Sequence, residues 1–421
     1  MADDELRRSQ AGLGLQEDVG LLTAPDVGRI VETAPVKEPQ TLGEWIRVNL
    51  FSGPFNSILT VVSAVFLIFV VYRLFGFLFL HSEWRVIQVK MKAYMVGGFP
   101  IEEVWRVWAS LYLVTVLAGV SSGATLRSFR PRLRTLVMVA VASVVAFLIV
   151  RYTVQTSTAR LLAAGVPLAF IVTNRLGRLA PRMIRRIRLW AWIALFPVVM
   201  VIILGFDGVP TKEWEGLFFN LTAATVGIVA SFPIGIALAL GRRSSLPAVR
   251  VFCVVVIEVF RGVPLVAWLI FSKFVVDLLL PPQLELDDIV KAFIAMTMFS
   301  AAYIAEIVRG GLQGVPEGQY EASRAIGLST MRMMGFIVLP QALRATIPAM
   351  IGHFISLFKD TALFSAIEVT ELLSAAQRLG LEFLGLEAQT LIFAAFIFWI
   401  VAFSMSRWSQ RLELRLGVGE R

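Results

Sequence analysis

Apolar runs of about twenty residues recur along this chain from Pro54 to the C-terminus, separated by short polar stretches. A helix needs about 20 apolar residues to cross the hydrocarbon core of a bilayer, so each run predicts a membrane-spanning helix. The pattern therefore predicts an all-α polytopic membrane protein with about ten transmembrane helices. The predicted spans are 54–80, 106–126, 133–151, 157–174, 188–206, 216–240, 249–276, 288–310, 346–367 and 389–406.

The composition supports this prediction, because 57% of the residues are hydrophobic and only 16% are charged. The net charge of +9 comes mostly from arginines in short loops, which indicates membrane topology and not a nucleic-acid partner. Basic loops alternate with weakly charged or acidic ones, except for the mixed loop 81–105. We therefore expect both termini in the cytoplasm.

The chain divides into four parts by composition. Residues 1–44 are polar, net acidic and proline-containing, which predicts a disordered cytoplasmic tail. Residues 45–206 form a predicted membrane extension of about five helices whose simplest role is a lipid-facing scaffold. Residues 207–410 are crowded with glycine, proline and intramembrane charge, which marks function by default. Residues 411–421 form a predicted cytoplasmic tail.

A polar, glycine-punctuated segment lies between two predicted spans, at 312–345. Its length suits two short helices with Gly327 at the bend, and we expect it to dock into a partner. The alternative is an ordinary solvated loop. That interpretation is reasonable for any one of these residues, but it is the weaker explanation of the run as a whole. The candidate docking residues are Gly318, Glu321, Ala322, Ser323, Gly327, Leu339 and Pro340.

The first intramembrane charge group contains Glu258 and Arg261, three residues apart and thus on one helix face, where they could pair. Gly262 and Pro264 predict a break in the helix just beyond. Broken helices at membrane depth occur where backbone is buried in protein or lines a cavity. A substrate pathway and a structural ion pair beside a kink remain equally open here.

Two further groups follow along the chain. Tyr303 and Glu306 lie within a predicted span, and Glu306 shares a face with an arginine at 309 that suits a membrane edge. Lys359, Asp360 and Thr361 interrupt another apolar run. A zwitterionic amino acid needs a cation for its carboxylate and an anion for its amino group. Either the 359–360 pair or the 258–261 pair supplies both, although self-neutralising pairs remain the alternative.

Several enzyme signatures are absent from the sequence. No glycine is followed by lysine, which excludes a Walker A loop, and His-Glu-x-x-His does not occur. Two histidines and one cysteine make a zinc site improbable. We therefore expect no enzyme, no cofactor bound by this chain, and ATP, if used, on another chain.

The phrases around these residues identify a family resemblance. The segment Glu321-Ala-Ser with Gly327 resembles the EAA loop of ABC importer permeases. The stretches 259–265, 301–311, 339–344 and 359–363 resemble the polar amino acid (histidine/glutamine-type) permeases. The chain departs from the common pattern at Ser323, Val263 and Ala362, where Ala, Thr and Ser are usual.

This resemblance covers about 216–410 and implies a C-terminal five-helix ABC importer permease core. The additional five-span N-terminal part is similar to that of the larger permease subunits of general L-amino-acid uptake systems of Gram-negative bacteria. The resemblance further implies a second permease subunit, an ATPase dimer carrying ATP and Mg, and a periplasmic amino-acid-binding protein at the bacterial inner membrane. The loop at 321–327 would then be a coupling helix that transmits rigid-body motion.

Two other classes of transport protein remain as alternatives. An ion-coupled secondary amino acid transporter would use the membrane carboxylates Glu258, Glu306 and Asp360 for proton coupling. A channel would need a filter-like sequence, and none is recognisable. The predicted docking loop favours the ATP-driven importer over both.

Overall fold

The computed structural model describes residues 41–125, 157–179, 181–279, 281 and 286–416. Over these residues the secondary structure is helical, apart from one isolated β-bridge between Gly216 and Glu371, so the all-α prediction is confirmed. The contacts divide the chain into two units, Met1–Ser82 and Glu83–Arg421. Residues 1–40, most of the predicted tail, lie outside the described residues.

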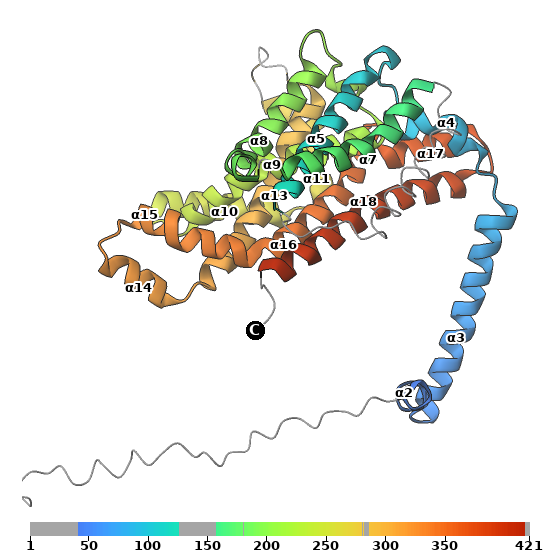
Figure 1. Ribbon diagram of the computed structural model, residues 1–421, viewed down its shortest axis with the longest axis horizontal. Helices are drawn as coiled ribbons and strands as arrows, with labels where there is room; N and C mark the ends of the chain where they lie inside the picture. Colours follow the sequence, from blue (N-terminus) through green and yellow to red (C-terminus); the bar gives the residue numbers. More distant parts are fainter. Residues whose placement is uncertain (1–40, 126–156, 180, 280, 282–285, 417–421) are drawn as a thin grey trace, which may run out of the picture. The chain divides into compact units, whose positions relative to one another are not determined.

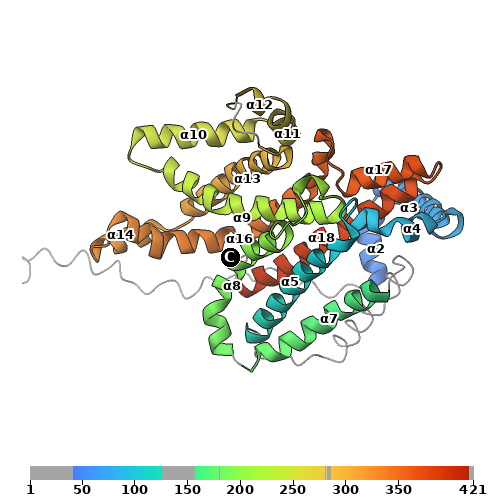
Figure 2. The same cartoon turned by 90° about the horizontal axis from the view of Figure 1, so that it is seen from above.

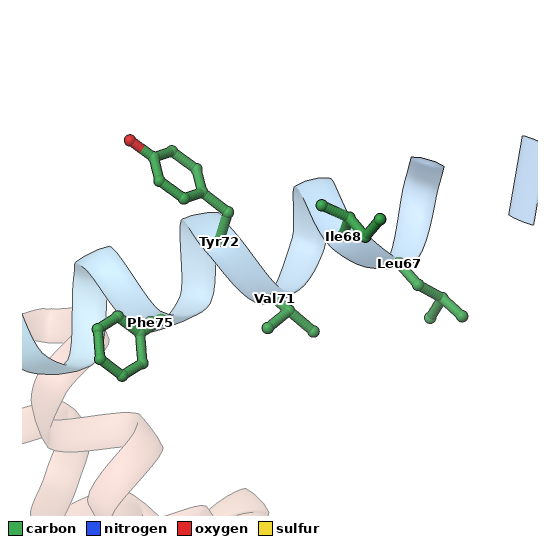
Figure 3. A pocket seen from close by; sticks show the side chains of 5 residues that line it. All are labelled: Leu67, Ile68, Val71, Tyr72 and Phe75. Carbon is green, nitrogen blue, oxygen red and sulfur yellow. The ribbon is translucent and has the colours of Figure 1, made fainter. Parts of the chain in front are cut away.

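The first unit contains α2 (Leu42–Leu50), α3 (Pro54–Phe75) and the π-helix η2 (Gly76–His81). Helix α2 begins inside the predicted tail because Thr41 and Glu44 form a capping box, in which each side chain bonds the backbone N–H of the other. Helix α3 has no buried residue. Figure 3 shows five of its side chains, which line an open hollow on the helix surface: Leu67, Ile68, Val71, Tyr72 and Phe75.

The second unit holds the remaining helices (Figure 1). Its first part comprises α4 (Arg85–Met95), η3 (Ile101–Glu103), α5 (Val104–Thr125), α7 (Ser157–Gly177), α8 (Pro181–Leu204) and η4 (Thr211–Glu213). Its second part comprises α9 (Gly216–Arg242), α10 (Pro247–Gly262), α11 (Leu265–Phe274), α12 (Val276–Leu279), α13 (Asp288–Gln313), α14 (Glu317–Ala325), α15 (Thr330–Met333), η5 (Met334–Val338), α16 (Leu339–Asp360), η6 (Thr361–Ile367), α17 (Leu372–Glu382) and α18 (Glu387–Leu416).

Helices α9 and α13 run along each other at the centre of this unit, and α16 packs against α13 and α18 (Figure 2). Close approach of α9 to α13 requires a glycine at Gly235, because a Cβ there would lie 2.6 Å from a side-chain carbon of Ile304. One hydrophobic core joins Phe99 and Ile203 from the first part to Phe219 and Met296 from the second. The extension after residue 82 therefore shares a core with the later helices.

Seven helices in the described residues are long and apolar enough to cross a membrane, or eight if one bent pair counts as a span. The predicted span 133–151 lies outside the described residues. The predicted span 157–174 corresponds to α7, whose apolar stretch Leu161–Gly177 is shorter than the others. The structure thus agrees with the prediction of long apolar helices, while their total of about ten stays a prediction.

The predicted single span 249–276 is wrong in shape, because α10 and α11 meet at 101°. Val263 is extended there, with φ −117° and ψ 136°, as expected for a residue that precedes a proline. Pro264 then precedes the first turn of α11 and has no N–H to continue α10. The break itself follows the Gly-Val-Pro sequence as predicted.

Two segments predicted as loops contain helices. Helix α4 lies in 81–105 and α17 in 368–387, and they pack together through buried Val86, Tyr94 and Leu372. Their polar faces are joined by an ion pair of 2.5 Å between Lys90 and Glu382. Helix α18 also extends to Leu416, so the residues predicted as a tail from 411 begin within a helix.

Candidate functional site

The candidate docking loop forms two short helices, α14 and α15, as predicted. They are separated at Gly327, whose φ of +76° is in the left-handed region that favours glycine. A Cβ at that position would have no heavy atom within 4 Å, so the constraint comes from the backbone and not from crowding. Beyond α15 a π-helical turn leads into α16, with Pro340 in its first turn, where the missing N–H costs nothing.

Helix α14 is held to the membrane helices through its buried face. The Tyr320 hydroxyl donates to the Leu312 carbonyl at 3.1 Å and accepts from Arg243 Nη1 at 3.2 Å. The Arg243 guanidinium also lies 5.8 Å from the centre of the Tyr320 ring. Ser323, the departure from the family pattern, is buried and donates to the Gln319 carbonyl at 2.6 Å.

The outer face of the same loop carries exposed side chains. Ile326, Met331 and Phe336 are large apolar residues on the surface. Glu321 and Ala322 of α14 are also exposed. Large apolar side chains exposed on a polar loop are a feature of protein-binding surfaces.

Charged side chains of α9, α10 and α13 converge on Glu306 of α13. Its Oε1 accepts from Arg242 Nη1 at 2.6 Å, and its Oε2 accepts from Arg309 Nε at 2.9 Å. Arg261 Nη1 lies 3.7 Å from the same Oε2. Glu258 Oε1 accepts from Arg242 at 3.2 Å. These five residues, which we call the arginine cluster, carry three positive and two negative charges.

The expected pairing within α10 is therefore replaced by pairing between helices. Glu258 contacts Arg242 of α9, and Arg261 contacts Glu306 of α13, although both residues lie on α10 as predicted. The pairing of Glu306 with Arg309, three residues apart, is present. The cluster thus joins three helices at the end of α9 that lies near the docking loop.

An aromatic and hydroxyl row continues from the arginine cluster. The Tyr303 ring stacks on His353 of α16 at 5.5 Å and 15°, and the Arg261 guanidinium lies 5.5 Å from its centre. His353 Nε2 is 2.9 Å from Ser300 Oγ, and Ser300 in turn donates to Ser231 Oγ of α9 at 2.9 Å. Side chains of four helices meet in this row.

Two buried donors beside this row lack a hydrogen-bond partner within the described residues. They are Arg261 Nε and Trp268 Nε1. Trp268 stacks on Phe260 across the bend between α10 and α11, with ring centres 4.4 Å apart. Buried donors are almost always paired, so two unpaired donors at one bend are unusual.

The third predicted group lies at the other end of α9. The Thr361 hydroxyl is buried, donates to the Phe358 carbonyl and accepts from Asn220 Nδ2 at 2.8 Å. Lys359 is exposed and Asp360 is half-buried beside it. Because Asn220 and Arg242 are 22 residues apart on α9, a rise of 1.5 Å per residue separates this group from the arginine cluster by about 33 Å.

Glu371 completes the network around Asn220. Its carboxylate is buried and accepts from Asn220 and from the backbone N–H groups of Leu373 and Ser374, where it caps α17. Burial raises the pKa of this carboxyl, against the opposing effect of these donors. Nearby Glu368 is exposed, and the hydrogen bond from Lys273 lowers its pKa.

The sequence analysis did not select Arg242, Arg243 or Glu371. The two arginines were assigned to loop charge, and Glu371 to an acidic loop. Nor did it select His353, whose contacts with Tyr303 and Ser300 depend on α13 and have no signal in the sequence of α16.

With this geometry in place, comparison with known proteins identifies the class. Residues 231–418 match the model of the binding-protein-dependent transport system inner membrane component family. The glutamate/glutamine/aspartate/asparagine transport system permease protein BztC of Rhodobacter capsulatus is 31% identical, and the match covers 91% of this chain and 95% of that protein. The chain therefore belongs to this family, and within it to the amino-acid ABC transporter permeases.

A second relative is named for the same class. The inner membrane amino-acid ABC transporter permease protein YhdY of Escherichia coli (strain K12) is 41% identical over 236 residues, which cover 54% of this chain and 64% of that relative. A crystal structure of an amino acid ABC transporter with histidines is 27% identical, covers 48% of this chain and 92% of its own, and has a TM-score of 0.43. The chain is thus a multi-pass transport subunit of the inner membrane, and the ATPase of such a system is a separate chain.

Proposed function

We propose that this chain, as an importer permease, carries polar L-amino acids of the glutamate, glutamine and aspartate kind across the bacterial inner membrane. The substrate class is supported by the name of the relative that covers nearly the whole chain. The structural observation that supports the proposal is the arginine cluster, which lies beside two unpaired buried donors, Arg261 Nε and Trp268 Nε1.

The cluster suits a zwitterion. The α-carboxylate accepts hydrogen bonds from the free Arg261 and Trp268 donors, and charge-assisted bonds to a guanidinium are the stronger kind. The α-ammonium meets the carboxylate of Glu258, which has only one arginine contact and is 56% exposed. In this proposal Lys359, Asp360 and Thr361, at the other end of α9, act at a separate stage of the same pathway.

Adjacent arginines at the end of α9 connect this site to the docking loop. Arg242 binds the carboxylates of Glu306 and Glu258, and Arg243 binds Tyr320 of α14. Movement of α14 in a groove of the ATPase would therefore pull on the end of α9 and on the arginine cluster together. The residues Gly318, Glu321, Ala322, Ser323, Gly327, Leu339 and Pro340 form the coupling loop in this mechanism.

The proposed assembly contains a second permease subunit, an ATPase dimer that binds ATP and Mg, and a periplasmic amino-acid-binding protein. The basic loops favour a cytoplasmic position for the coupling loop and for both termini. The exposed Ile326, Met331 and Phe336 form the contact with the ATPase.

The test is detergent co-purification of the tagged chain from its native membrane, followed by uptake in proteoliposomes. We expect an ATPase with a Walker A loop and a shorter permease to co-elute, and glutamate or glutamine uptake to require internal ATP and the binding protein. A chain that elutes alone and transports under a proton gradient without ATP would instead support the ion-coupled transporter.

A further inference from the structure

The membrane extension, residues 45–206, contains a long segment in which every charged residue is an arginine. Between residues 104 and 206 the sequence contains thirteen arginines and no lysine, aspartate or glutamate. An arginine stays charged at any physiological pH, so each needs an anion or water. No carboxylate is available within this segment, and the counter-charges must come from outside it.

Six of these arginines gather where α7 ends and α8 begins (Figure 2). Arg182, Arg185 and Arg186 lie three and four residues apart, so they share one face of α8, and all three are exposed. Ile184 is buried, on the opposite side of the same turn. The group, which we call the α7–α8 arginine patch, comprises Arg175, Arg178, Arg182, Arg185, Arg186 and Arg188.

The patch has few internal partners. Arg178 Nη2 donates to Asn174 Oδ1 at 2.8 Å, and Arg185 Nε donates to the Pro181 carbonyl. Arg178 Nε is buried without a hydrogen-bond partner, and no described carboxylate lies within ion-pair distance of any of the six. By contrast, Arg106 on α5 pairs with Glu103 and with carbonyls at the end of α8.

The surroundings of the patch are apolar and exposed. Leu179 is 79% exposed, Met183 64% and Trp190 70%. Met183 and Trp190 lie beside the arginine face on a helix that is apolar enough to span a membrane. Cationic side chains next to exposed apolar and tryptophan side chains at a helix end are typical of the membrane–water interface.

We propose that the α7–α8 arginine patch binds the phosphate headgroups of anionic phospholipids. The planar guanidinium donates two parallel hydrogen bonds to a phosphate, and clustered arginines at the end of a span attract anionic lipid. The phosphates contact the exposed Arg182, Arg185 and Arg186, while the acyl chains cover Met183 and Trp190. The site lies on the extension and is independent of the proposed substrate and ATPase.

The experiment is native mass spectrometry of the full-length chain in mild detergent, titrated with phosphatidylglycerol and, separately, with phosphatidylcholine. The test variant R182Q/R186Q removes two charges from the patch, and the matched control R407Q/R411Q removes two charges from the end of α18. The variant R182K/R186K keeps the charge but loses the fork geometry. Thermal melting of each variant checks that it is folded.

We expect the wild type and the control to bind phosphatidylglycerol more tightly than phosphatidylcholine. R182Q/R186Q should weaken phosphatidylglycerol binding about 25-fold, since each arginine near a membrane surface contributes about fivefold. Phosphatidylglycerol binding by R182K/R186K should be intermediate between that of the wild type and that of R182Q/R186Q. Inorganic phosphate at equal concentration should not displace the lipid. Equal lipid binding in R182Q/R186Q and the control would overturn the proposal. Unchanged lipid binding with loss of a co-purifying ATPase would also overturn it and assign the patch to an acidic protein.

Discussion

The two ends of α9 hold their neighbours in different ways. At one end Arg242 joins a cluster of five charged groups, in which Glu306 is 15% exposed and serves three arginines. At the other end Asn220 joins buried Thr361 and Glu371 through hydrogen bonds of 2.8 and 3.2 Å, and its side-chain oxygen accepts from the first N–H of α17. The first end has an excess of charge and unpaired donors, whereas the second has its polar groups satisfied.

This difference indicates which end moves. Ion pairs among partly exposed long side chains exchange partners at low energetic cost, because each pair contributes little and alternatives lie close by. A buried network loses the full desolvation cost of each group when one bond breaks. The end near the docking loop is therefore suited to rearrange, and the Asn220 end is suited to act as a fixed point.

The strongest test of the mobile end is Gly327→Asp. A side chain at φ +76° costs about 1–2 kcal/mol and would displace α14 from α15, so we expect substrate-stimulated ATP hydrolysis to be abolished while the chain remains in the membrane. ATPase activity of the reconstituted complex measures this. Gly335→Asp is the matched control, since it adds the same charge to the loop at a position with ordinary φ and free space. Substrate-stimulated ATP hydrolysis at the wild-type rate in Gly327→Asp would show that the bend has no role in coupling.

The next test is Glu306→Gln, which leaves three arginines around a neutral amide. We expect the free energy of unfolding to fall by about 2 kcal/mol, because the three arginines repel one another once the mostly shielded carboxylate between them is neutral. Glu258→Gln, whose carboxylate is more exposed, should cost less than about 1 kcal/mol. Thermal melting in detergent compares the two. Equal shifts would mean that Glu306 is not the centre of the cluster.

Sequence reasoning placed some of these residues well and others not at all. The break after Arg261 followed from Gly262 and Pro264, and the bend at Gly327 followed from its position in a polar loop, because both depend on local backbone chemistry. Arg242 was assigned to loop charge, since its role depends on a carboxylate 64 residues further along. Such pairings have no periodicity by which to find them.

The same contrast explains α4 and α17. Both are short, and α4 mixes Lys90 and Lys92 with its apolar face, so hydropathy predicted a loop. Their helical state depends on each burying its apolar side against the other, through Tyr94 and Leu372, and on the cap that Glu371 provides. Short helices that are stabilised by tertiary contacts are the elements that single-sequence reasoning misses.

A smaller effect should follow from Tyr320→Phe, which keeps the ring but removes the hydroxyl. The bonds to the Leu312 carbonyl and to Arg243 would be lost, at a cost of about 1 kcal/mol. We expect the complex to assemble but to hydrolyse more ATP for each amino acid imported, since α14 is less firmly tied to α9. Tyr72→Phe on the exposed α3 serves as the control. An unchanged ratio would mean that Arg243 does not transmit motion from the loop.

The smallest effect is expected at the fixed end, from Asp360→Asn. Asp360 is half-buried but outside the Asn220 network, so its charge is free to act on a passing substrate, and uptake should fall about threefold with ATPase co-purification unchanged. Thr361→Val is the contrasting variant, because it breaks the bond to Asn220 and should lower the melting temperature without changing the apparent KM. Wild-type uptake in Asp360→Asn would leave Lys359 and Asp360 as a structural pair. A raised KM in Thr361→Val would place the Asn220 network on the pathway and remove the distinction between the two ends of α9.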